Sequence, residues 1–364
     1  MKGAAAVLHG VGQFRMQEFP LPVVGPDDGL LKMDLAGVCA SDIKYFTGSI
    51  PLNYPVILGH EITGTIAAIG ERMAARHHVQ VGDRVIVEAT IACGHCSHCV
   101  AGRQNFCHNR IGYGKTVQAT VAPHFWGGYG QYLYLSPQAT LQKIPDEMPP
   151  EIGVLIGAVI ANGIEWVTRQ GELRCGEVVV IQGVGQQGMA AAAAAKAGGA
   201  SLIIATGLGA DARRFDLIRE FGADVCIDVE QEDPVARVKE LTGGEMADLV
   251  VDVTGNPKAI AVSIRLVRKA GRVISAGTTG ANTITPLYMD QIVFNGIRLQ
   301  GVFSKTSPAV TTAIKLAHSG RFPFHKMITH RLPLHRAEDA IRTLNREFPD
   351  QDPIKVVLDP WAGD

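Results

Sequence analysis

A glycine-rich turn between two apolar runs constrains the fold of this chain more than any other part of its sequence. Residues 178–181 form a β-branched run, which is typical of a strand buried on both faces of a sheet. The sequence GVGQQG follows at residues 183–188, and residues 189–197 are almost entirely alanine, the strongest helix former. A second apolar run at residues 202–204 predicts the next strand. The stretch therefore predicts a strand, a turn, a helix and a strand, the unit of doubly wound α/β sheets.

The three glycines of this turn predict a dinucleotide-binding site. Gly183 suits a tight turn, Gly185 lets the backbone approach a pyrophosphate, and Gly188 lets the helix pack closely on the strand. The helix that follows presents unpaired N–H groups to an anion. A GxGxxG motif alone is most often an ordinary glycine turn. The strand before it and the helix and strand after it favour a site for NAD or NADP.

Composition limits the kinds of protein this chain can be. With 364 residues, 46% of them hydrophobic and 19% charged, it is long enough for two domains. The net charge of −1 gives no broad field for nucleic acid or for an anionic membrane. We see no basic-apolar-small leader after Met1 and no apolar run of spanning length. We therefore expect a cytoplasmic protein with a small-molecule substrate and no membrane or nucleic-acid partner.

Four of the seven cysteines are closely spaced and predict a metal site. In a cytosolic chain, cysteines point to metal or redox chemistry before disulfides. A loop with few apolar residues carries Cys93, Cys96, Cys99 and Cys107. Four thiolates at such spacing are typical of a closed structural zinc site. An iron–sulfur cluster is the alternative, although the ferredoxin ending of cysteine and proline after a three-residue gap is missing.

A second group of candidate ligands lies earlier in the chain. Cys39 is followed closely by Ser41 and Asp42, and His60 is followed by Glu61. Taken singly, the cysteine would be a small buried hydrophobe and the histidine an ordinary polar residue. Taken together, the two clusters supply the residue types of a catalytic zinc site, which needs three protein ligands and one open position.

The whole set of motifs resembles the zinc-containing medium-chain dehydrogenase/reductase superfamily, which includes alcohol, sorbitol and threonine dehydrogenases. The motifs are MKGA at residues 1–4, GVCASD at 37–42, GHE at 59–61, the four cysteines, GVGQQG, DVTG at 252–255 and AGT at 276–278. The resemblance implies a GroES-like, irregular β catalytic domain at residues 1–156 and 304–364, with a zinc lobe at about 93–107. A Rossmann domain with a doubly wound parallel sheet would occupy residues 157–303.

The resemblance also implies roles for the residues of the first domain. The catalytic zinc and its support are assigned as follows: Cys39 and His60 as ligands, Glu61 as an acid beside the metal, and Asp42 as the partner of the ligand histidine. Ser41 corresponds to the hydroxyl that takes the substrate proton, and Lys44 to a downstream relay residue. The four clustered cysteines correspond to the structural zinc ligands, which makes two zinc ions per chain.

One departure from the family concerns a further zinc ligand. Many relatives carry a cysteine or an acid at the start of the domain-joining helix, where this chain has Gly157 and Ala158. Neither residue has a side chain that binds zinc. Glu61, water or Glu151 would then complete the site.

The second departure concerns the choice between NAD and NADP. The strand that begins at residue 202 ends in Gly207, where an acid would grip the ribose 2′-hydroxyl of NAD. Arg213 and Arg214 offer a counter-charge for the 2′-phosphate of NADP, which favours NADP, unless both lie on a solvated helix face. The resemblance places three further residues at the cofactor: Thr254, Thr278 and Lys355.

These assignments predict a zinc-dependent alcohol dehydrogenase. It would transfer hydride reversibly between a secondary alcohol, polyol or hydroxy-acyl substrate and NAD(P). One alternative is an NADPH-dependent reductase of activated alkenes or carbonyls with only a structural zinc. The other is a non-catalytic, nucleotide-binding regulatory protein. Relatives suggest a homodimer or a homotetramer.

Overall fold

The chain divides into two compact units. The structure is a computed structural model that describes residues 1–280 and 282–363. The first unit comprises Met1–Ala158 and Phe324–Asp364, and the second comprises Val159–Pro323. Residues 304–323 thus belong to the second unit, because helix α11 (Ser307–His318) packs against α5 (Ala161–Ile164) within it.

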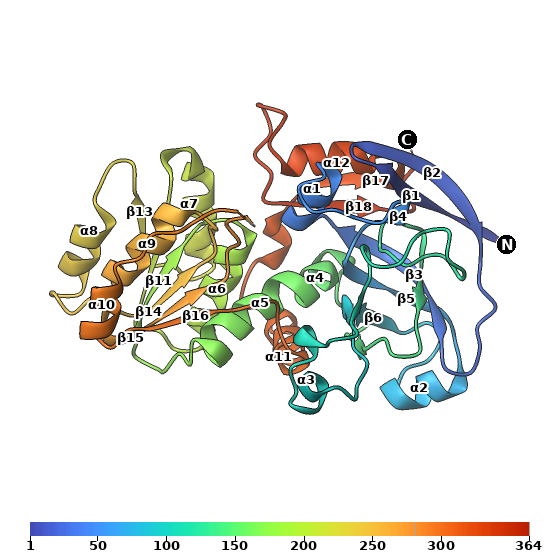
Figure 1. Cartoon of the computed structure of the whole chain (residues 1–364), viewed down its shortest axis with the longest axis horizontal. Helices are drawn as coiled ribbons and strands as arrows, with labels where there is room; N and C mark the ends of the chain where they lie inside the picture. The colour runs from blue at the N-terminus through green and yellow to red at the C-terminus, as the bar shows by residue number, and fades with distance from the viewer. Residues whose placement is uncertain (281, 364) are drawn as a thin grey trace. The chain divides into compact units, whose positions relative to one another are not determined.

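The first unit is built from largely antiparallel sheets (Figure 1). A small sheet has the order β2-β1-β4: β2 (Gln13–Pro20), β1 (Lys2–Gly10) and β4 (Val56–Ile57). The larger sheet has the order β10-β6-β5-β3-β18-β17, with β9 also paired to β3: β10 (Leu141–Lys143), β6 (Arg84–Val87), β5 (Glu61–Ile69), β3 (Gly29–Gly37), β18 (Lys355–Asp359), β17 (Ile328–Pro333) and β9 (Tyr132–Leu135). A separate hairpin pairs β7 (Thr90–Ile91) with β8 (Ile111–Gly112). This is the irregular β domain that the sequence predicts.

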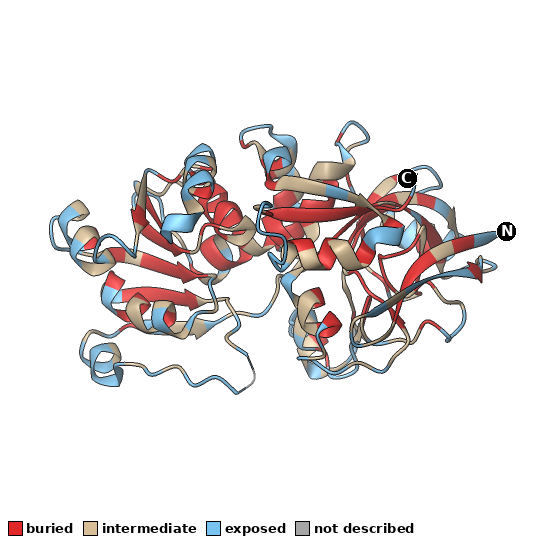
Figure 2. Ribbon diagram, turned by 90° about the horizontal axis from the view of Figure 1, so that it is seen from above, coloured by how far each residue is buried: buried red, intermediate tan, exposed pale blue. Residues whose placement is uncertain are grey.

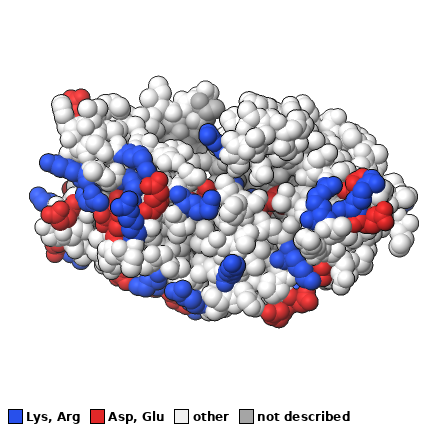
Figure 3. Space-filling view, turned by 90° about the horizontal axis from the view of Figure 1, so that it is seen from below, with Lys and Arg blue, Asp and Glu red and all other residues white. Residues whose placement is uncertain are grey.

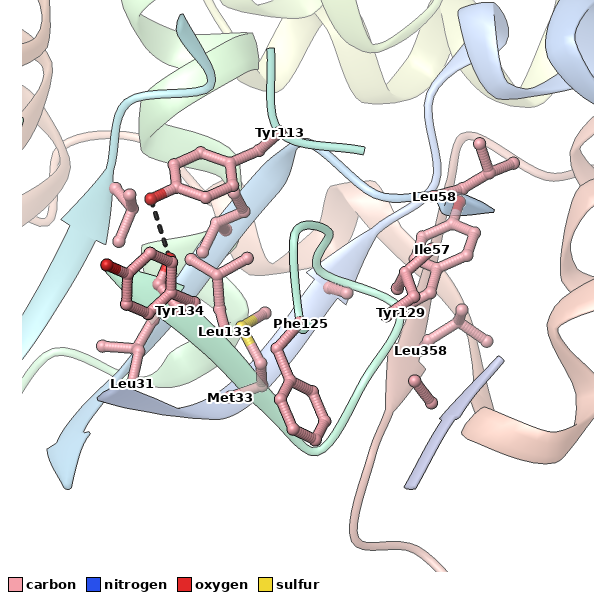
Figure 4. Packing of buried hydrophobic residues seen from close by; sticks show 14 of the residues in the cluster. Leu31, Met33, Ile57, Leu58, Tyr113, Phe125, Tyr129, Leu133, Tyr134 and Leu358 are labelled. Carbon is pink, nitrogen blue, oxygen red and sulfur yellow. Dashed lines mark hydrogen bonds between the residues drawn. The ribbon is translucent and has the colours of Figure 1, made fainter. Parts of the chain in front are cut away.

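Short helices complete the first unit. The α-helices are α1 (Ala40–Phe46), α2 (Glu71–His77), α3 (Ser97–Val100), α4 (Pro150–Leu155) and α12 (Ala337–Leu344). Three 3₁₀ segments are η1 (Gln104–Phe106), η5 (Phe324–Met327) and η6 (Leu334–Arg336). The aliphatic and aromatic core of the unit lies between its sheets (Figure 4). The buried hydroxyl of Tyr113 donates to the carbonyl of Tyr134 over 2.8 Å, so this polar group within the core is satisfied.

The second unit contains a parallel sheet of six strands. Their order is β13-β12-β11-β14-β15-β16: β13 (Val225–Asp228), β12 (Leu202–Gly207), β11 (Val178–Gln182), β14 (Ala247–Asp252), β15 (Val267–Ser275) and β16 (Arg298–Gly301). The β-branched run at residues 178–181 forms the central strand, and residues 179–181 are fully buried. The strand order reverses beside β11, and such a reversal opens a ligand crevice at the carboxyl ends of the strands.

Helices cover this sheet on its faces, and Figure 2 shows buried strands beside helices with exposed outer surfaces. The helices are α6 (Gln186–Ala197), α7 (Ala212–Glu220), α8 (Pro234–Leu241), α9 (Pro257–Leu266) and α10 (Met289–Phe294), with a 3₁₀ turn η4 (Gly209–Asp211). α6 packs beside α7, and α8 packs beside α9. The unit is the doubly wound α/β domain that the sequence predicts.

A continuous helical segment, Pro150–Gln170, runs from the first unit into the second. It consists of α4, a π-helical stretch η2 (Ile156–Ile160), α5 and a second π-helical stretch η3 (Glu165–Gln170). Within the described residues it is the one helix long and apolar enough to span a membrane. However, 67% of its apolar window is buried inside the protein, as is usual for a core helix.

Candidate active site and zinc lobe

Two neighbouring strands bring the first group of candidate ligands together. β3 and β5 are antiparallel, and Gly37 at the end of β3 pairs with Glu61 at the start of β5. His60 therefore lies beside the turn that carries Cys39 into helix α1. The backbone N–H of Cys39 donates to Asp42 Oδ2 over 2.9 Å, which satisfies one of the unpaired donors at the start of this helix.

The His60 ring lies between Ser41 and Asp42. Its Nε2 is 3.3 Å from Ser41 Oγ, and its Nδ1 is 3.4 Å from Asp42 Oδ1. Asp42 is fully buried, and the hydroxyl of Tyr129 donates to its Oδ2 over 2.9 Å. The carboxylate is thus fixed on two sides and faces one ring nitrogen, which leaves Nε2 for a metal or a proton.

The charges of this group are strongly coupled. Burial alone would raise the pKa of Asp42, but the His60 ring, the Cys39 N–H and the Tyr129 hydroxyl hold it below its usual value. Burial would lower the pKa of His60, yet the Asp42 and Cys39 charges raise it well above its usual value. Asp42 is therefore ionised and favours a positive charge, a proton or a metal ion, on the His60 side.

Glu61 is held by a lysine from the end of the chain. Lys355 and Glu61 are 0% and 1% exposed, and the Lys355 ammonium forms an ion pair with Glu61 Oε2. The same ammonium donates to the carbonyl of Val38 over 2.9 Å. A Cβ at position 37 would collide with the Glu61 carboxylate, so glycine is required there. Lys355, which the resemblance assigned to the pyrophosphate, is instead engaged inside the first unit.

The side chains of Cys39 and His60 have the chemistry of two ligands of one metal ion. The Cys39 sulfur acts on the His60 ring, since it helps to raise the pKa of His60. Among the described residues, the ligand atoms of Cys39, His60 and Glu61 do not all lie within 4.8 Å of one another. Lys355 engages one Glu61 oxygen. The other oxygen, Oε1, is buried and has no hydrogen-bond partner in the described part of the chain. Such an orphaned acceptor suits a nearby cation.

The remaining candidate ligands do not add to this set. Gly157 and Ala158 lie in the π-helical stretch η2, and neither has a side chain that can bind a metal. The Glu151 carboxylate is paired with Arg331, whose Nη1 donates to Glu151 Oε1 over 2.8 Å. Lys44 lies one helical turn after Ser41 on α1, which places the two residues on one face.

The four clustered cysteines form a close group around helix α3. The sulfurs of Cys93, Cys96, Cys99 and Cys107 all lie within 4.8 Å of one another. The Sγ atoms of Cys93 and Cys99 are 4.0 Å apart, and those of Cys96 and Cys99 are 3.5 Å apart. A tetrahedral site with zinc–sulfur bonds of about 2.3 Å needs sulfurs about 3.8 Å apart. The group therefore fits a zinc ion.

The local backbone already favours thiolates in this lobe. The backbone N–H groups of Cys99 and His108 lower the pKa of Cys96 to about 6. Burial and the neighbouring Cys96 sulfur raise the pKa of Cys99 to about 12, since adjacent thiolates repel each other when no cation is bound. A divalent ion would remove that repulsion.

Replacing Cys99 by serine is expected to remove one zinc ion per chain, because three thiolates no longer close the tetrahedron. The loop around α3 should then become sensitive to limited proteolysis. Zinc can be counted by plasma mass spectrometry. Cys175→Ser, at an exposed cysteine of the second unit, is the matched control and should leave zinc unchanged. Equal zinc content in the two variants would contradict this assignment.

The glycine turn after β11 has the geometry of a phosphate cradle. Gly183 has a φ of +105°, which glycine adopts without strain. A Cβ on Gly188 would lie 1.9 Å from the carbonyl oxygen of Gly183, so helix α6 packs closely only with glycine there. Gly185 has open space where its Cβ would be, and it precedes the first turn of α6. The backbone thus leaves room for an anion at the helix N-terminus.

The two arginines near the end of β12 have different surroundings. β12 ends at Gly207, which packs against Phe215. Arg214 is buried, and its Nη1 is 3.6 Å from Asp211 Oδ1. Arg213 is exposed and, within the described residues, makes no ion pair. Of the two arginines, Arg213 is the more accessible to a ligand phosphate.

The loops that carry the two candidate threonines are pressed together. Thr254 Oγ1 donates to Asp252 Oδ1 over 2.6 Å, and a Cβ at Gly255 would lie 2.6 Å from the carbonyl of Thr278. These loops follow β14 and β15, at the same sheet edge as the glycine turn. The cofactor candidates of the second unit therefore converge on one edge.

Two contacts at the site come from residues that the sequence did not identify as its support. Tyr129 holds Asp42 from 87 residues away, and Lys355 holds Glu61 from 294 residues away. Figure 4 shows the Tyr129 ring beside Ile57 and Leu58 in the core. No local spacing marks either residue, because both partners are placed by the sheet and not by the chain.

Known protein families and relatives match most of the chain. Residues 25–146 match the alcohol dehydrogenase GroES-like domain, and residues 187–319 match the zinc-binding dehydrogenase domain. The chain is 38% identical to a probable alcohol dehydrogenase of Mycobacterium tuberculosis, over 98% of both chains. It is 32% identical to the sorbitol dehydrogenase of Bacillus subtilis, over 93% of this chain and 92% of that one. The crystal structure of an alcohol dehydrogenase from Thermotoga maritima matches with a TM-score of 0.90 and 25% identity, over 99% of both chains.

Proposed function

The chain belongs to the zinc-containing medium-chain dehydrogenase superfamily, and we propose that it oxidises a secondary alcohol, a polyol or a hydroxy-acyl compound by reversible hydride transfer to NAD(P). Its relatives are named alcohol and sorbitol dehydrogenases, so the chain is an oxidoreductase that acts on CH–OH groups. The grouping of Ser41 and Asp42 on opposite sides of His60, with Cys39 beside the ring, carries the proposal.

In this proposal Cys39 and His60 are ligands of the catalytic zinc, and Glu61 Oε1 is a further candidate ligand. The ion would supply Lewis-acid chemistry, polarising the substrate oxygen and lowering the pKa of the hydroxyl. Asp42 fixes the ring angle of His60 and keeps Nε2 directed at the metal position. Ser41 receives the hydroxyl proton, and Lys44, one helical turn on, passes it outward. In the reverse direction the same residues return the proton to a carbonyl oxygen.

The direct test is an activity assay over a panel of substrates. Purified protein is supplied with NAD or NADP and with secondary alcohols, polyols such as sorbitol, and activated alkenes with NADPH. The proposal predicts reduction of the cofactor by at least one alcohol of the panel. Turnover of alkenes alone would contradict it and would favour the reductase alternative, to which the absent ligand at Gly157 and Ala158 points.

We propose NADP as the preferred cofactor, because Gly207 carries no acid and Arg213 is exposed nearby. Arg213→Gln is expected to raise the KM for NADP about tenfold or more, since a charge-assisted hydrogen bond to a phosphate contributes about 1.5–3 kcal/mol. The KM for NAD should stay nearly constant. Arg219→Gln, an exposed change on the same helix α7, is the control. Equal changes for both cofactors would refute this role of Arg213.

We further propose that the protein is a homodimer or homotetramer joined at the outer edge of the parallel sheet. In the part of the chain that the structure describes, β16 pairs with β15 alone and ends the sheet, so its other side is open there. Helix α10, which precedes β16 in the chain, exposes large apolar side chains, with Phe294 82% and Val293 67% exposed. Exposed apolar groups next to an open strand suit a second copy of the same chain.

Phe294→Asp is expected to weaken such an oligomer about a hundredfold, because burying a large aromatic side chain contributes about 1.5–3 kcal/mol and a charge opposes burial. Sedimentation velocity over a concentration series measures the effect. Val81→Asp, at an exposed valine of the first unit, should leave the assembly unchanged. A Phe294→Asp protein with wild-type assembly would show that the contact lies elsewhere.

The other partners follow from charge and chemistry. Figure 3 shows Lys and Arg side chains interspersed with Asp and Glu on the face that it displays, with no broad area of one sign. We propose a small-molecule substrate and neither nucleic acid nor membrane as partner. None of the seven cysteines forms a disulfide bond, which suits the reducing cytoplasm where we place the protein.

A further inference from the structure

A hollow of about 240 Å³ lies at the amino edge of the parallel sheet in the second unit. Its charged lining consists of four arginines and two glutamates: Glu172, Arg174, Glu177, Arg268, Arg272 and Arg298. Two of the arginines are on β15, one begins β16, and Glu177 directly precedes β11. The glycine turn follows the carboxyl end of β11, so the hollow lies at the opposite edge of the sheet from the cofactor candidates.

Hydrogen-bond donors outnumber acceptors around this hollow. Arg272 is only 8% exposed, and it donates to the Glu172 carbonyl over 3.1 Å and to Glu177 Oε2 over 2.5 Å. Its Nε is buried and has no hydrogen-bond partner in the described part of the chain. Leaving a buried donor of a charged group unsatisfied is costly, so this network lacks an acceptor.

The acids close to the hollow are already used by other arginines. Arg298 Nη1 contacts both carboxylate oxygens of Glu172 over 3.1 Å. Arg268 Nε donates to Asp248 Oδ1 over 2.6 Å, and its Nη1 donates to a backbone carbonyl. Arg174 is exposed at the rim, and within residues 1–280 and 282–363 its guanidinium makes no hydrogen bond or ion pair. Within the described residues, four guanidinium groups thus lie near three carboxylates, and the guanidinium of Arg174 is paired with none of them.

We propose that this hollow binds a small phosphate-class anion, either inorganic phosphate or the phosphate group of a monoester. Guanidinium groups match phosphate oxygens in paired hydrogen bonds, and several converging arginines favour a doubly charged anion over chloride. Arg174 and Arg268 supply the free donors. The bound anion ties the segment before β11 to β15 and so stabilises the sheet edge away from the redox site.

Calorimetric titration of the full chain tests this site. Inorganic phosphate and glycerol phosphate are titrated at constant ionic strength, with NAD or NADP saturating so that the glycine turn is occupied. Arg174→Gln is the test variant, since within the described residues the Arg174 guanidinium has no hydrogen bond or ion pair to lose. Arg174→Lys retains the charge. Arg265→Gln, an exposed change on α9, is the matched control.

The expected result is saturable binding of one anion per chain, weakened about tenfold by Arg174→Gln and less by Arg174→Lys. Tighter binding of glycerol phosphate would identify a monoester as the ligand, and tighter binding of phosphate the free ion. Binding that disappears when the cofactor is saturating would overturn the proposal. So would equal affinity in Arg174→Gln and Arg265→Gln. Because the assay needs no turnover, its result is separate from that of the dehydrogenase proposal.

Discussion

His60→Ala is expected to lower kcat/KM for alcohol oxidation by about a thousandfold or more. Cys39, Ser41 and Asp42 are arranged around the His60 imidazole, and the substitution removes a ligand of the proposed catalytic zinc. Lewis-acid stabilisation of the developing charge is worth several kcal/mol, and each 1.36 kcal/mol corresponds to a factor of ten in rate. Steady-state assays with the best alcohol of the substrate panel measure the change.

Cofactor binding separates this effect from unfolding. The glycine turn belongs to the second unit, so His60→Ala should still bind the reduced cofactor with wild-type affinity, as followed by nicotinamide fluorescence. His108→Ala, at an exposed histidine beside the four-cysteine group, is the control and should keep full activity. A His60→Ala enzyme with more than a tenth of wild-type activity would refute the proposed catalytic site.

Lys355→Met is expected to destabilise the first unit by about 3–5 kcal/mol, because it leaves the buried Glu61 carboxylate without a partner. Both side chains are essentially inaccessible to solvent. Methionine retains the length and apolar stem of lysine, so the loss is of charge and not of packing. The shift of the guanidinium chloride unfolding midpoint, followed by tryptophan fluorescence, measures it.

A double-mutant cycle isolates the ion pair from other effects of the substitution. Glu61→Gln removes the negative charge, and the variant with both changes should recover most of the stability that Lys355→Met loses. Additive losses in the double variant would mean that Lys355 stabilises the fold through its stem or through the Val38 carbonyl alone. The cycle therefore tests the charge pairing itself.

The sequence predicts those structural features that depend on residues close together in the chain. The β-branched run, the three glycines and the alanine helix appear in the structure as β11, the turn and α6. The cysteines that are close in the chain are also close in space, because a tetrahedral metal site can be built from one loop. Periodicity and spacing act within tens of residues, and these features are that short.

Features that depend on distant pairing were not predicted. The sheet joins β18 to β3, and this carries Lys355 to Glu61 across most of the chain. The Tyr129 hydroxyl donates to Asp42 from 87 residues away, and no local pattern in the sequence links these two residues. The boundary of the second unit also depends on the packing of α11 against α5, which no break in composition marks. Tertiary contacts determine the Lys355–Glu61 pair, the Tyr129–Asp42 hydrogen bond and the boundary of the second unit.

The number of zinc ions per chain in gently purified protein tests the central claim most directly. Plasma mass spectrometry is applied to the wild type and to Cys39→Ser/His60→Ala. We predict close to two zinc ions per wild-type chain and close to one in the variant, which retains the four-cysteine site and loses alcohol oxidation. One zinc ion in both proteins, with no gain of alcohol oxidation when zinc is added to the wild type, would contradict a catalytic zinc at Cys39 and His60.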